Sequence, residues 1–378
     1  MIQEILSYFN PLDHLELWLI ASFFIAFIVS MSTFPAIFNI SEAKHLMDEP
    51  GDRSIHVVKT PTLGGVGIYI SLVVVITTIG ALLDTKILLL ILGSLTILFF
   101  LGLKDDLLIL SPTKKLFGQF LAAMVLIVFT DTRILGFSGI FGVTILPYWV
   151  SVGFTLFVYI LVINAYNLID GVDGLAGSLA LLGAGAYAFI SIKINDITMA
   201  TIAVAVLGAL IPFLRLNFSK DKKIFMGDTG SMIIGFLIAF FTVRFLNKTQ
   251  LEQDSFFYNS APIMVFSILF FPLLDTFRIF MIRLLILKKN PFSADKNHLH
   301  HRFLDLGFSH MQTTMYIVIL NLMLITFAYT IRSFDILFQF ICLIIVGTLL
   351  YSTLFIYNWI MKKGWLPHFL KTIKNYKL

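Results

Sequence analysis

Residues 87–103 read ILLLILGSLTILFFLGL, a stretch without one charged side chain. A helix that crosses a bilayer needs about 20 mainly apolar residues, so this stretch predicts a transmembrane helix. Similar runs recur along the 378-residue chain, which is 58% hydrophobic and 13% charged. Soluble domains carry about 25% charged residues. The composition therefore excludes an ordinary soluble protein and favours one integral membrane domain over residues 1–378.

The apolar runs predict an all-α, polytopic bundle of about 11 transmembrane helices. No Lys or Arg precedes Lys44, so the first run lacks the charged start of a signal peptide and is expected to remain as a helix. The expected ranges are 15–40, 64–83, 86–103, 116–130, 147–165, 175–193, 196–214, 230–246, 260–287, 313–331 and 336–360.

Lysine and arginine residues orient this bundle, because cytoplasmic loops of membrane proteins carry an excess of both. Of the 27 such residues, Arg278 lies inside a predicted span and six lie in one set of alternating loops. All the others lie in the opposite loops and the C-terminal tail. The asymmetry predicts an N-terminus outside and a C-terminus in the cytoplasm. The six are Lys86, Arg133, Lys193, Arg244, Lys248 and Arg332.

The net charge of +5 is assigned to loops that face anionic lipid headgroups, not to nucleic-acid binding. The one cysteine, Cys342, lies in an apolar run. It excludes a disulfide within the chain and a zinc site built from thiolates. The polar motifs all fall in the five predicted cytoplasmic loops.

The first two of these loops each carry a polar motif. In the first, Arg53, His56 and Lys59 precede Gly64-Gly65, which opens a helix. Backbone N–H groups at a helix start can bind phosphate, and the alternative is a plain turn.

In the second loop, Asp105 and Asp106 end a long apolar helix, and Lys114 and Lys115 follow Ser111-Pro112. Adjacent residues on a helix do not share a face. One carboxylate is therefore expected to point into a site while the other pairs elsewhere, unless both simply lie at a solvated helix end.

The third loop carries Asn164, Asn167, Asp170 and Asp173, which recur every three residues. Helical geometry places such residues along one slowly drifting face. The two glycines of Asp-Gly-Val-Asp-Gly permit close backbone approach. Oxygen-bearing side chains without a neighbouring Lys or Arg form a surface that suits a hard cation such as Mg²⁺.

The fourth and fifth loops complete the set. In the fourth, Asp228 lies between two glycines just before a span, and it is either a helix cap or a second metal ligand. The fifth contains His298-Leu-His300-His301-Arg302. With Lys and Arg nearby and no cysteine, anion binding is favoured over zinc. Imidazoles that are half-protonated near pH 6.5 would suit that role, and three surface histidines without a function are the alternative.

Together the loops resemble the bacterial polyprenyl-phosphate N-acetylhexosamine-1-phosphate transferases. The resemblance runs from about residue 53 to residue 302. It rests on the Asn-x-x-Asn-x-x-Asp-Gly-x-Asp-Gly string from Asn164, on Phe-Met-Gly-Asp-x-Gly-Ser from Phe225, and on Asp-Asp followed by Leu-Ser-Pro. Members start lipid-linked assembly of cell-envelope polymers such as O-antigen. A sister branch uses UDP-MurNAc-pentapeptide for peptidoglycan. The His-x-His-His-Arg loop looks like the GlcNAc branch.

The resemblance implies roles for individual residues. Asn167 and Asp228 are expected to ligate Mg²⁺, with Mn²⁺ as an alternative ion, and Asp105 and Asp106 to include the catalytic carboxylate. Asp170 and Asp173 are expected on the nucleotide side. Phe225 is expected to stack on uracil unless it is a core aromatic, and the fifth-loop residues from His298 to Arg302 are expected to bind the diphosphate. The complete set of expected substrate-binding residues is larger. These residues are Lys59, Asn164, Asp170, Asp173, Phe225, His298, His300, His301 and Arg302.

The same resemblance implies transfer of GlcNAc 1-phosphate from UDP-GlcNAc to undecaprenyl phosphate, with release of UMP, at the cytoplasmic face of the bacterial inner membrane. UDP-GalNAc and related donors stay open, and a homodimer is compatible. The expected chemistry is attack of the lipid phosphate on the sugar-linked phosphorus. Asp105 or Asp106 would act as base, as positioning group or as covalent nucleophile.

Two rival classes are less compatible with the motifs. A transporter holds ionisable residues near the membrane midplane, whereas the carboxylates of this chain gather at one membrane face. Asp275 and Arg278 do lie inside the ninth apolar run, three apart, and are interpreted as a helical pair. A CDP-alcohol phosphotransferase requires Asp-Gly-x-x-Ala-Arg, and the segment from Asp170 lacks that arginine.

Overall fold

A computed structural model describes residues 14–44, 47–48, 60–108, 110–252, 254–286, 288 and 298–362. The long helices are α2 (Leu15–Ala43), α3 (Gly64–Thr78), α4 (Thr85–Leu108), α5 (Pro112–Thr130), α6 (Tyr148–Ile169), α7 (Leu175–Lys193), α8 (Ile197–Asn217), α9 (Gly227–Leu251), α13 (His310–Thr330) and α14 (Ile336–Lys362). The shorter elements are β1 (Met47–Asp48), β2 (Thr60–Pro61), η1 (Gly80–Leu82), η2 (Ile140–Gly142), α10 (Ala261–Ile268), α11 (Phe270–Met281), η3 (Ile282–Ile286) and α12 (Leu299–Asp305).

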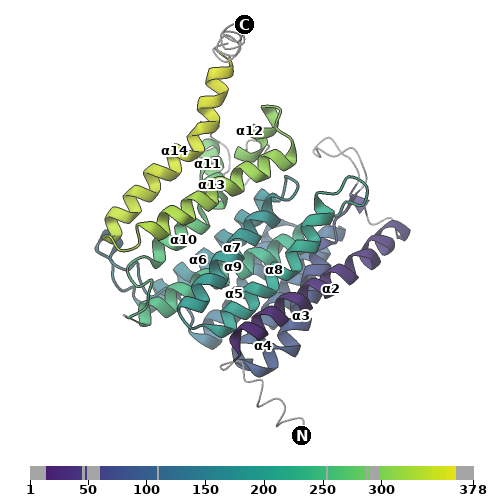
Figure 1. Ribbon diagram of the computed structural model, residues 1–378, viewed down its shortest axis with the longest axis horizontal. Helices are drawn as coiled ribbons and strands as arrows, with labels where there is room; N and C mark the ends of the chain where they lie inside the picture. Colours follow the sequence, from purple (N-terminus) through teal and green to yellow (C-terminus); the bar gives the residue numbers. More distant parts are fainter. Residues whose placement is uncertain are drawn as a thin grey trace, which may run out of the picture.

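The helices confirm the predicted polytopic bundle. Among the described residues, ten helices are long and apolar enough to cross a membrane, and the bent pair α10 and α11 raises the number to 11. Each coincides with one of the predicted ranges. In Figure 1, α2 begins at the lower end of the bundle, and α14 runs toward the opposite end, where α12 also lies. An odd number of crossings accounts for this arrangement.

The outer helices are apolar on the face that points away from the bundle. Large hydrophobic side chains there are at least half exposed, which water would not favour and a lipid phase would. They include Phe24 on α2, Phe100 on α4, Phe129 on α5 and Phe277 on α11. In contrast, α9 is buried along nearly its whole length and forms the centre of the bundle.

Close packing of α3 and α4 against the start of α9 depends on two glycines. A Cβ atom on Gly65 of α3 would lie 2.1 Å from the Gly230 nitrogen, and one on Gly102 of α4 would lie 2.4 Å from the Thr229 Cα. Small residues at helix contacts let backbones approach closely in membranes. These two contacts fix the first turn of α9, which carries Asp228, against the end of α4.

The ninth predicted span, 260–287, is not one continuous helix. It breaks at Leu269, and its two parts are bent by 69°. Pro272 has no N–H for the carbonyl of Ile268, four residues earlier, and a proline also clashes with that position. The Asn321 side chain of α13 takes over, because its amide donates to the Ile268 carbonyl at 3.1 Å and accepts from the Phe271 N–H at 3.3 Å. The broken backbone is thus satisfied inside the bundle.

Candidate active site

The acidic residues predicted from separate loops meet at one end of the bundle. Asp105 and Asp106 lie in the last turn of α4, Asn167 lies in the last turn of α6, and Asp228 lies in the first turn of α9. Hydrogen bonds and ion pairs join these three helix ends directly. The sequence predicted only that these loops lie at the same membrane face, because successive spans alternate in direction.

Asp106 caps the N-terminus of α9. Its carboxylate accepts the Asp228 N–H at 2.7 Å, the Thr229 N–H at 3.1 Å and the Thr229 hydroxyl at 2.6 Å. The first N–H groups of a helix have no partner within the helix, and the positive end of the helix dipole favours a carboxylate. Gly227, at φ +71°, brings the backbone against this carboxylate. Asp106 therefore holds Asp228 in place.

Asp105 has a different environment from its neighbour. It is buried, accepts the Leu110 N–H, and forms an ion pair with Lys115 of α5. The Lys115 ammonium also lies 3.1 Å from the Asp228 Oδ2. One cation therefore joins the end of α4 to the start of α9. The two adjacent carboxylates thus have different direct partners, but neither pairs away from the site, because both lie beside the start of α9.

Asn167 contacts Asp228 from the opposite side. Its amide donates to the Asp228 Oδ1 and to the Ser231 hydroxyl, the latter at 2.9 Å. Rotation of this amide by 180° would present its oxygen to the same point. Asp228 thus has an ammonium on one oxygen and an amide on the other.

Asp170 follows directly at the end of α6, where it is half-buried. Burial raises the pKa of Asp170 well above its ordinary value, and the negative charges of Asp228, Asp106 and Asp173 raise it further. The carboxylates at this end of the bundle therefore repel one another.

The donor set at this end fits a divalent cation. Asn167 and Asp228 already contact each other, so an amide oxygen and a carboxylate oxygen can reach one ion. Oxygen donors of this type are those that Mg²⁺ prefers. Burial is the main cause of the raised pKa of Asp170, but the negative charges of Asp228, Asp106 and Asp173 add to it, and such an ion would neutralise them.

Asp173 belongs to a separate polar group. Its Oδ2 lies 2.6 Å from the Lys223 ammonium and 3.0 Å from the His310 Nδ1. Burial raises the pKa of Asp173, but the hydrogen bonds and charges of His310 and Lys223 outweigh burial and lower the pKa below its ordinary value. The Lys223 ammonium also lies 5.1 Å from the centre of the Phe225 ring. Phe225 is half-buried, and the Lys223 ammonium lies over its ring.

Two asparagines near these loops have positions that favour a structural role. The Asn164 amide donates to Gln119 of α5 at 2.8 Å and to the Ile160 carbonyl at 2.7 Å. Asn217 accepts the Gly174 N–H and donates to the Ile224 carbonyl at 2.7 Å. Asn217 therefore fastens the loop after α6 to the loop after α8, and the structure brings Asn164 to α5 and not to the carboxylates.

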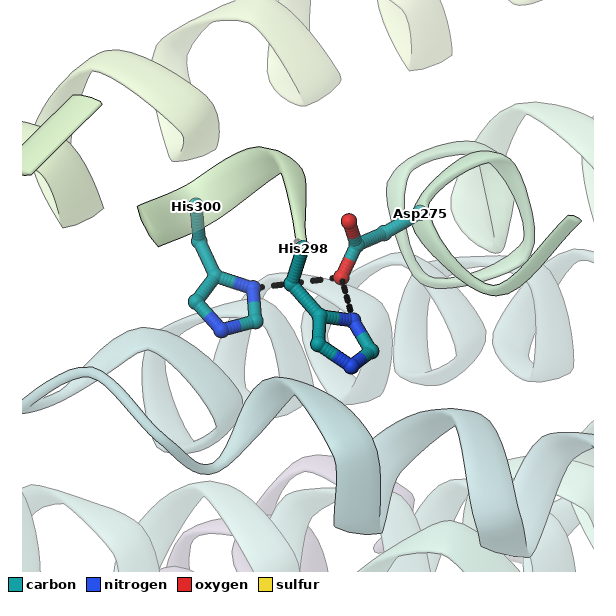
Figure 2. Close-up of side chains that lie close together, drawn as sticks. All are labelled: Asp275, His298 and His300. Carbon is teal, nitrogen blue, oxygen red and sulfur yellow. Dashed lines mark hydrogen bonds and ion pairs between the residues drawn. The ribbon is translucent and has the colours of Figure 1, made fainter. Parts of the chain in front are cut away.

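His298 and His300 are buried and bound to a carboxylate, so the alternative of three surface histidines without a function does not hold for these two. His298 and His300 each place their Nδ1 atom beside the Oδ2 of Asp275 on α11, at 3.0 and 3.1 Å (Figure 2). The expected helical pair between Asp275 and Arg278 is thus wrong, since Asp275 turns toward the histidines. Burial lowers the pKa of His301 to about 4, and the charges of His300 and His298 contribute. A half-protonated His301 near pH 6.5 is excluded.

Other predicted residues have separate contacts or lie outside the described residues. Arg302 lies on the exposed side of α12 and forms an ion pair with Asp305 at 3.6 Å. Lys59 lies outside the described residues, as do Arg53 and His56. The N–H groups of Gly64 and Gly65 donate to the carbonyls of Phe225 and Met226, both at 2.9 Å. The phosphate-binding interpretation of that helix start is therefore wrong, because its donors are used by backbone.

The sequence interpretation missed three residues that organise the site. Lys115 was visible in the second loop but not assigned to the carboxylates. His310 stands alone after the fifth loop, with no motif to mark it. Asp275 had the clearest signal, since a carboxylate inside an apolar run is costly and usually functional.

Helical bundles with carboxylates, an amide and imidazoles gathered at one membrane end are the architecture of integral membrane enzymes. The model of glycosyl transferase family 4 matches residues 88–246, which include the acidic residues and Phe225. A probable undecaprenyl-phosphate N-acetylglucosaminyl 1-phosphate transferase of Bacillus subtilis (strain 168) is 31% identical over 315 residues, covering 82% of this chain and 85% of the relative.

Two further relatives extend this similarity. The decaprenyl-phosphate N-acetylglucosaminephosphotransferase of Mycobacterium tuberculosis (strain ATCC 25618 / H37Rv) is 31% identical, with 71% of each chain covered. The undecaprenyl-phosphate alpha-N-acetylglucosaminyl 1-phosphate transferase of Escherichia coli (strain K12) is 26% identical, with 92% of this chain and 94% of the relative covered. The chain belongs to glycosyl transferase family 4, which confirms the family expected from the motifs.

Proposed function

We propose that this chain transfers N-acetylglucosamine 1-phosphate from UDP-GlcNAc to undecaprenyl phosphate and releases UMP. The observation that carries the proposal is the convergence of Asp105, Asp228 and Asn167 at one end of a membrane bundle. Relatives that cover most of the chain are named for N-acetylglucosamine transfer to polyprenyl phosphates, which supports both substrates.

The site is proposed to face the cytoplasm of a bacterial inner membrane. The excess of Lys and Arg in the loops at that end supports this orientation. UDP-sugars are made in the cytoplasm, so a donor site there has direct access to its substrate. The lipid acceptor would approach within the bilayer.

The bundle contains an apolar cavity of about 350 Å³ between α6, α9, α10 and α11, lined by side chains such as Phe157, Leu161 and Leu273. Residues of the loop between α5 and α6, such as Phe137, also line it, so the cavity lies toward the end of the bundle opposite the carboxylates. The proposal of a lipid acceptor therefore rests on the relatives and not on this cavity.

The proposed reaction is a direct phosphoryl transfer. An oxygen of the lipid phosphate attacks the sugar-linked phosphorus, the bond from that phosphorus to the bridging oxygen breaks, and UMP leaves with the electron pair. A divalent ion held by Asn167 and Asp228, Mg²⁺ or Mn²⁺, supplies charge neutralisation for the diphosphate when bound. Lys115 contributes a further positive charge beside Asp228.

The contacts of Asp105 and Asp106 support different roles for these two adjacent carboxylates. Asp106 positions Asp228 through the three hydrogen bonds that cap α9. Asp105 is left as the group that orients or deprotonates the acceptor. A phosphate monoester has a second pKa near 6, so the acceptor is mostly ionised at pH 7 and Asp105 acts chiefly by position.

The substrates are tested in a membrane assay that measures UMP release with undecaprenyl phosphate and a panel of UDP-sugars. Activity is expected with UDP-GlcNAc and Mg²⁺. Activity only with UDP-MurNAc-pentapeptide would move the chain to the peptidoglycan branch.

The metal site is tested by Asp228→Asn. This variant should lose UMP release and Mg²⁺-dependent binding of UDP-GlcNAc while the extracted protein stays folded. Undiminished activity in this variant would contradict the metal site.

A further inference from the structure

Asp275 is a carboxylate placed where a membrane bundle rarely has one. It lies in α11, after the bend at Leu269, and it is fully buried. An isolated buried carboxylate is costly unless donors satisfy it. Its position on the inner face of a broken span suggests a task beyond packing.

Three donors satisfy this carboxylate. The Leu299 N–H donates to the Oδ1, and the Nδ1 atoms of His298 and His300 lie within hydrogen-bond distance of the Oδ2. The two imidazole rings are stacked, with centres 5.2 Å apart and planes 19° apart. Asp275 thus anchors the start of α12 to α11.

The contacts with Asp275 decide which imidazole nitrogens are left for other partners. A carboxylate keeps the proton of each imidazole on Nδ1, because only that atom faces it. Figure 2 shows that both Nε2 atoms lie on the ring edges turned away from Asp275. The reactive face of the pair is therefore the Nε2 face.

The Nε2 of His300 is buried and has no hydrogen-bond partner among the described residues. Gly171 lies on that side, since a Cβ atom added to it would lie 3.5 Å from this Nε2. Gly171 directly follows Asp170, so the Nε2 faces the loop that carries the nucleotide-side acids. A buried polar atom without a partner costs about 1–3 kcal/mol, which a ligand would recover.

We propose that Asp275 is a positioning residue for the transfer, which holds the Nδ1 proton and the orientation of His298 and His300 so that the His300 Nε2, when it also carries a proton, donates a hydrogen bond to a phosphate oxygen of a bound substrate. This inference rests on the proposed function. The phosphate belongs either to the UDP-sugar or to the polyprenyl phosphate. His301 remains neutral at pH 7, so it adds no competing positive charge.

A metal ion held by Asp275, His298 and His300 is the alternative that the same atoms offer, since the three lie close enough to share one ion. The hydrogen bonds favour the positioning role. The carboxylate already has three protein donors, and the unpartnered atom is the Nε2 and not the Nδ1 that would face the ion.

The test is a double-mutant cycle on the full-length extracted protein, with UMP release from UDP-GlcNAc and undecaprenyl phosphate as the readout. The variants are Asp275→Asn, His300→Ala and the combination of both. Asp275→Asn should lower kcat/KM about 10- to 100-fold, as is typical when an orienting carboxylate is removed from a histidine. Because Asp275 acts through His300, the double variant should lose no more than His300→Ala alone.

Two further variants separate positioning from folding. Asp275→Ser is the second variant, since it leaves room for water beside the imidazoles and should show the same non-additive loss. Asn321→Ala removes a buried side chain that braces the same bend without touching the histidines. It should lower thermal stability while the activity per folded molecule stays near that of the wild type.

The kinetics also identify which phosphate is bound. A raised KM for UDP-GlcNAc alone assigns the contact to the sugar nucleotide, and a raised KM for the lipid alone assigns it to the acceptor. Three outcomes would overturn the inference and leave the proposed function standing. They are additive losses in the cycle, undiminished activity of Asp275→Asn, and the finding of one metal ion per chain that this variant loses. A wild type that releases no UMP would overturn the proposed function, and the inference with it.

Discussion

At the scale of single residues, Asp105 and Asp106 illustrate how adjacent carboxylates divide their tasks. Asp106 accepts three hydrogen bonds from the start of α9, whereas Asp105 pairs with Lys115. The side chains of neighbouring residues on a helix point in different directions. Their sequence therefore predicts two environments, but the partners of Asp106 come from a helix more than 100 positions away in the chain, whereas Lys115 comes from the next helix.

The contacts of Asp106 predict a loss of stability in Asp106→Asn. Asparagine offers one acceptor oxygen where three donors now converge, so the cap of α9 weakens by about 1–2 kcal/mol. The measurement is the thermal unfolding midpoint of the extracted protein. Asp305→Asn is the matched control, because Asp305 is an exposed carboxylate in a surface ion pair and should change stability by less than about 0.5 kcal/mol. Equal midpoints for the two variants would contradict the cap.

Asp170 predicts a dependence of stability on pH. Its pKa is raised in the folded protein, so the folded state binds more protons than the unfolded state above the ordinary Asp pKa of about 3.9. Stability must then fall as pH rises from that value to the raised pKa, and remain level beyond it. With Mg²⁺ chelated, Asp170→Asn should remove the contribution of Asp170 to the fall in the free energy of unfolding with pH. That contribution is about 1.4 kcal/mol for each unit by which the pKa is raised.

Thermal unfolding midpoints of the wild type and Asp170→Asn across this pH range check the prediction. The two profiles should diverge as pH rises, with the variant gaining relative to the wild type, and added Mg²⁺ should bring them together. Profiles that remain parallel would show that the pKa of Asp170 is not raised in the folded protein.

At the scale of elements, most spans were predictable because a membrane helix is set by the length of an apolar run. The bend at Leu269 was not predicted, although Pro272 marks it, because length alone makes 260–287 one span. The short helix α12 was also missed, since seven polar and apolar residues carry no clear periodicity. Its place in the fold comes from the tertiary contact with Asp275.

The site was predictable in its residue types and less so in its partners. The array from Asn167 to Asp173 indicated a cation site because it lacks positive side chains in its own segment. Lys223 nevertheless reaches Asp173 from another loop, and Lys115 reaches Asp228, which Asn167 contacts, from α5. Such contacts are set by packing between elements, which local spacing does not encode.

Packing of α4 against α9 predicts a sharp effect for Gly102→Ala. The new Cβ would lie 2.4 Å from the Thr229 Cα and 3.1 Å from the Asp228 carbonyl carbon, so α4 must shift away and displace Asp228. Overpacking of this kind costs about 1–3 kcal/mol, and UMP release should fall at least tenfold. Gly93→Ala is the matched control on the same helix, because nothing lies within 4 Å of its added Cβ.

Unfolding midpoints and UMP release per folded molecule are measured for both glycine variants. Gly93→Ala should be neutral or slightly stabilising, since alanine is the better helix former. If Gly102→Ala behaved like Gly93→Ala in both measurements, the close contact between α4 and α9 would not control the position of Asp228.

At the scale of the whole molecule, the charge of the loops predicts its orientation in the membrane. Lys222 lies in the loop between α8 and α9, at the end of the bundle with the carboxylates, and Thr144 lies in the loop between α5 and α6, at the opposite end. Both are exposed. The proposed function requires the first of these loops to face the cytoplasm, where Lys and Arg are in excess.

The orientation is measured by cysteine labelling, which the composition makes simple because Cys342 is the single cysteine. In a Cys342→Ser background, a maleimide that cannot cross membranes should label Thr144→Cys in whole cells. It should label Lys222→Cys only after the inner membrane is opened. The reverse pattern would place the carboxylates and histidines outside the cytoplasm, away from the supply of UDP-sugars, and the proposed transfer would then have no access to its donor.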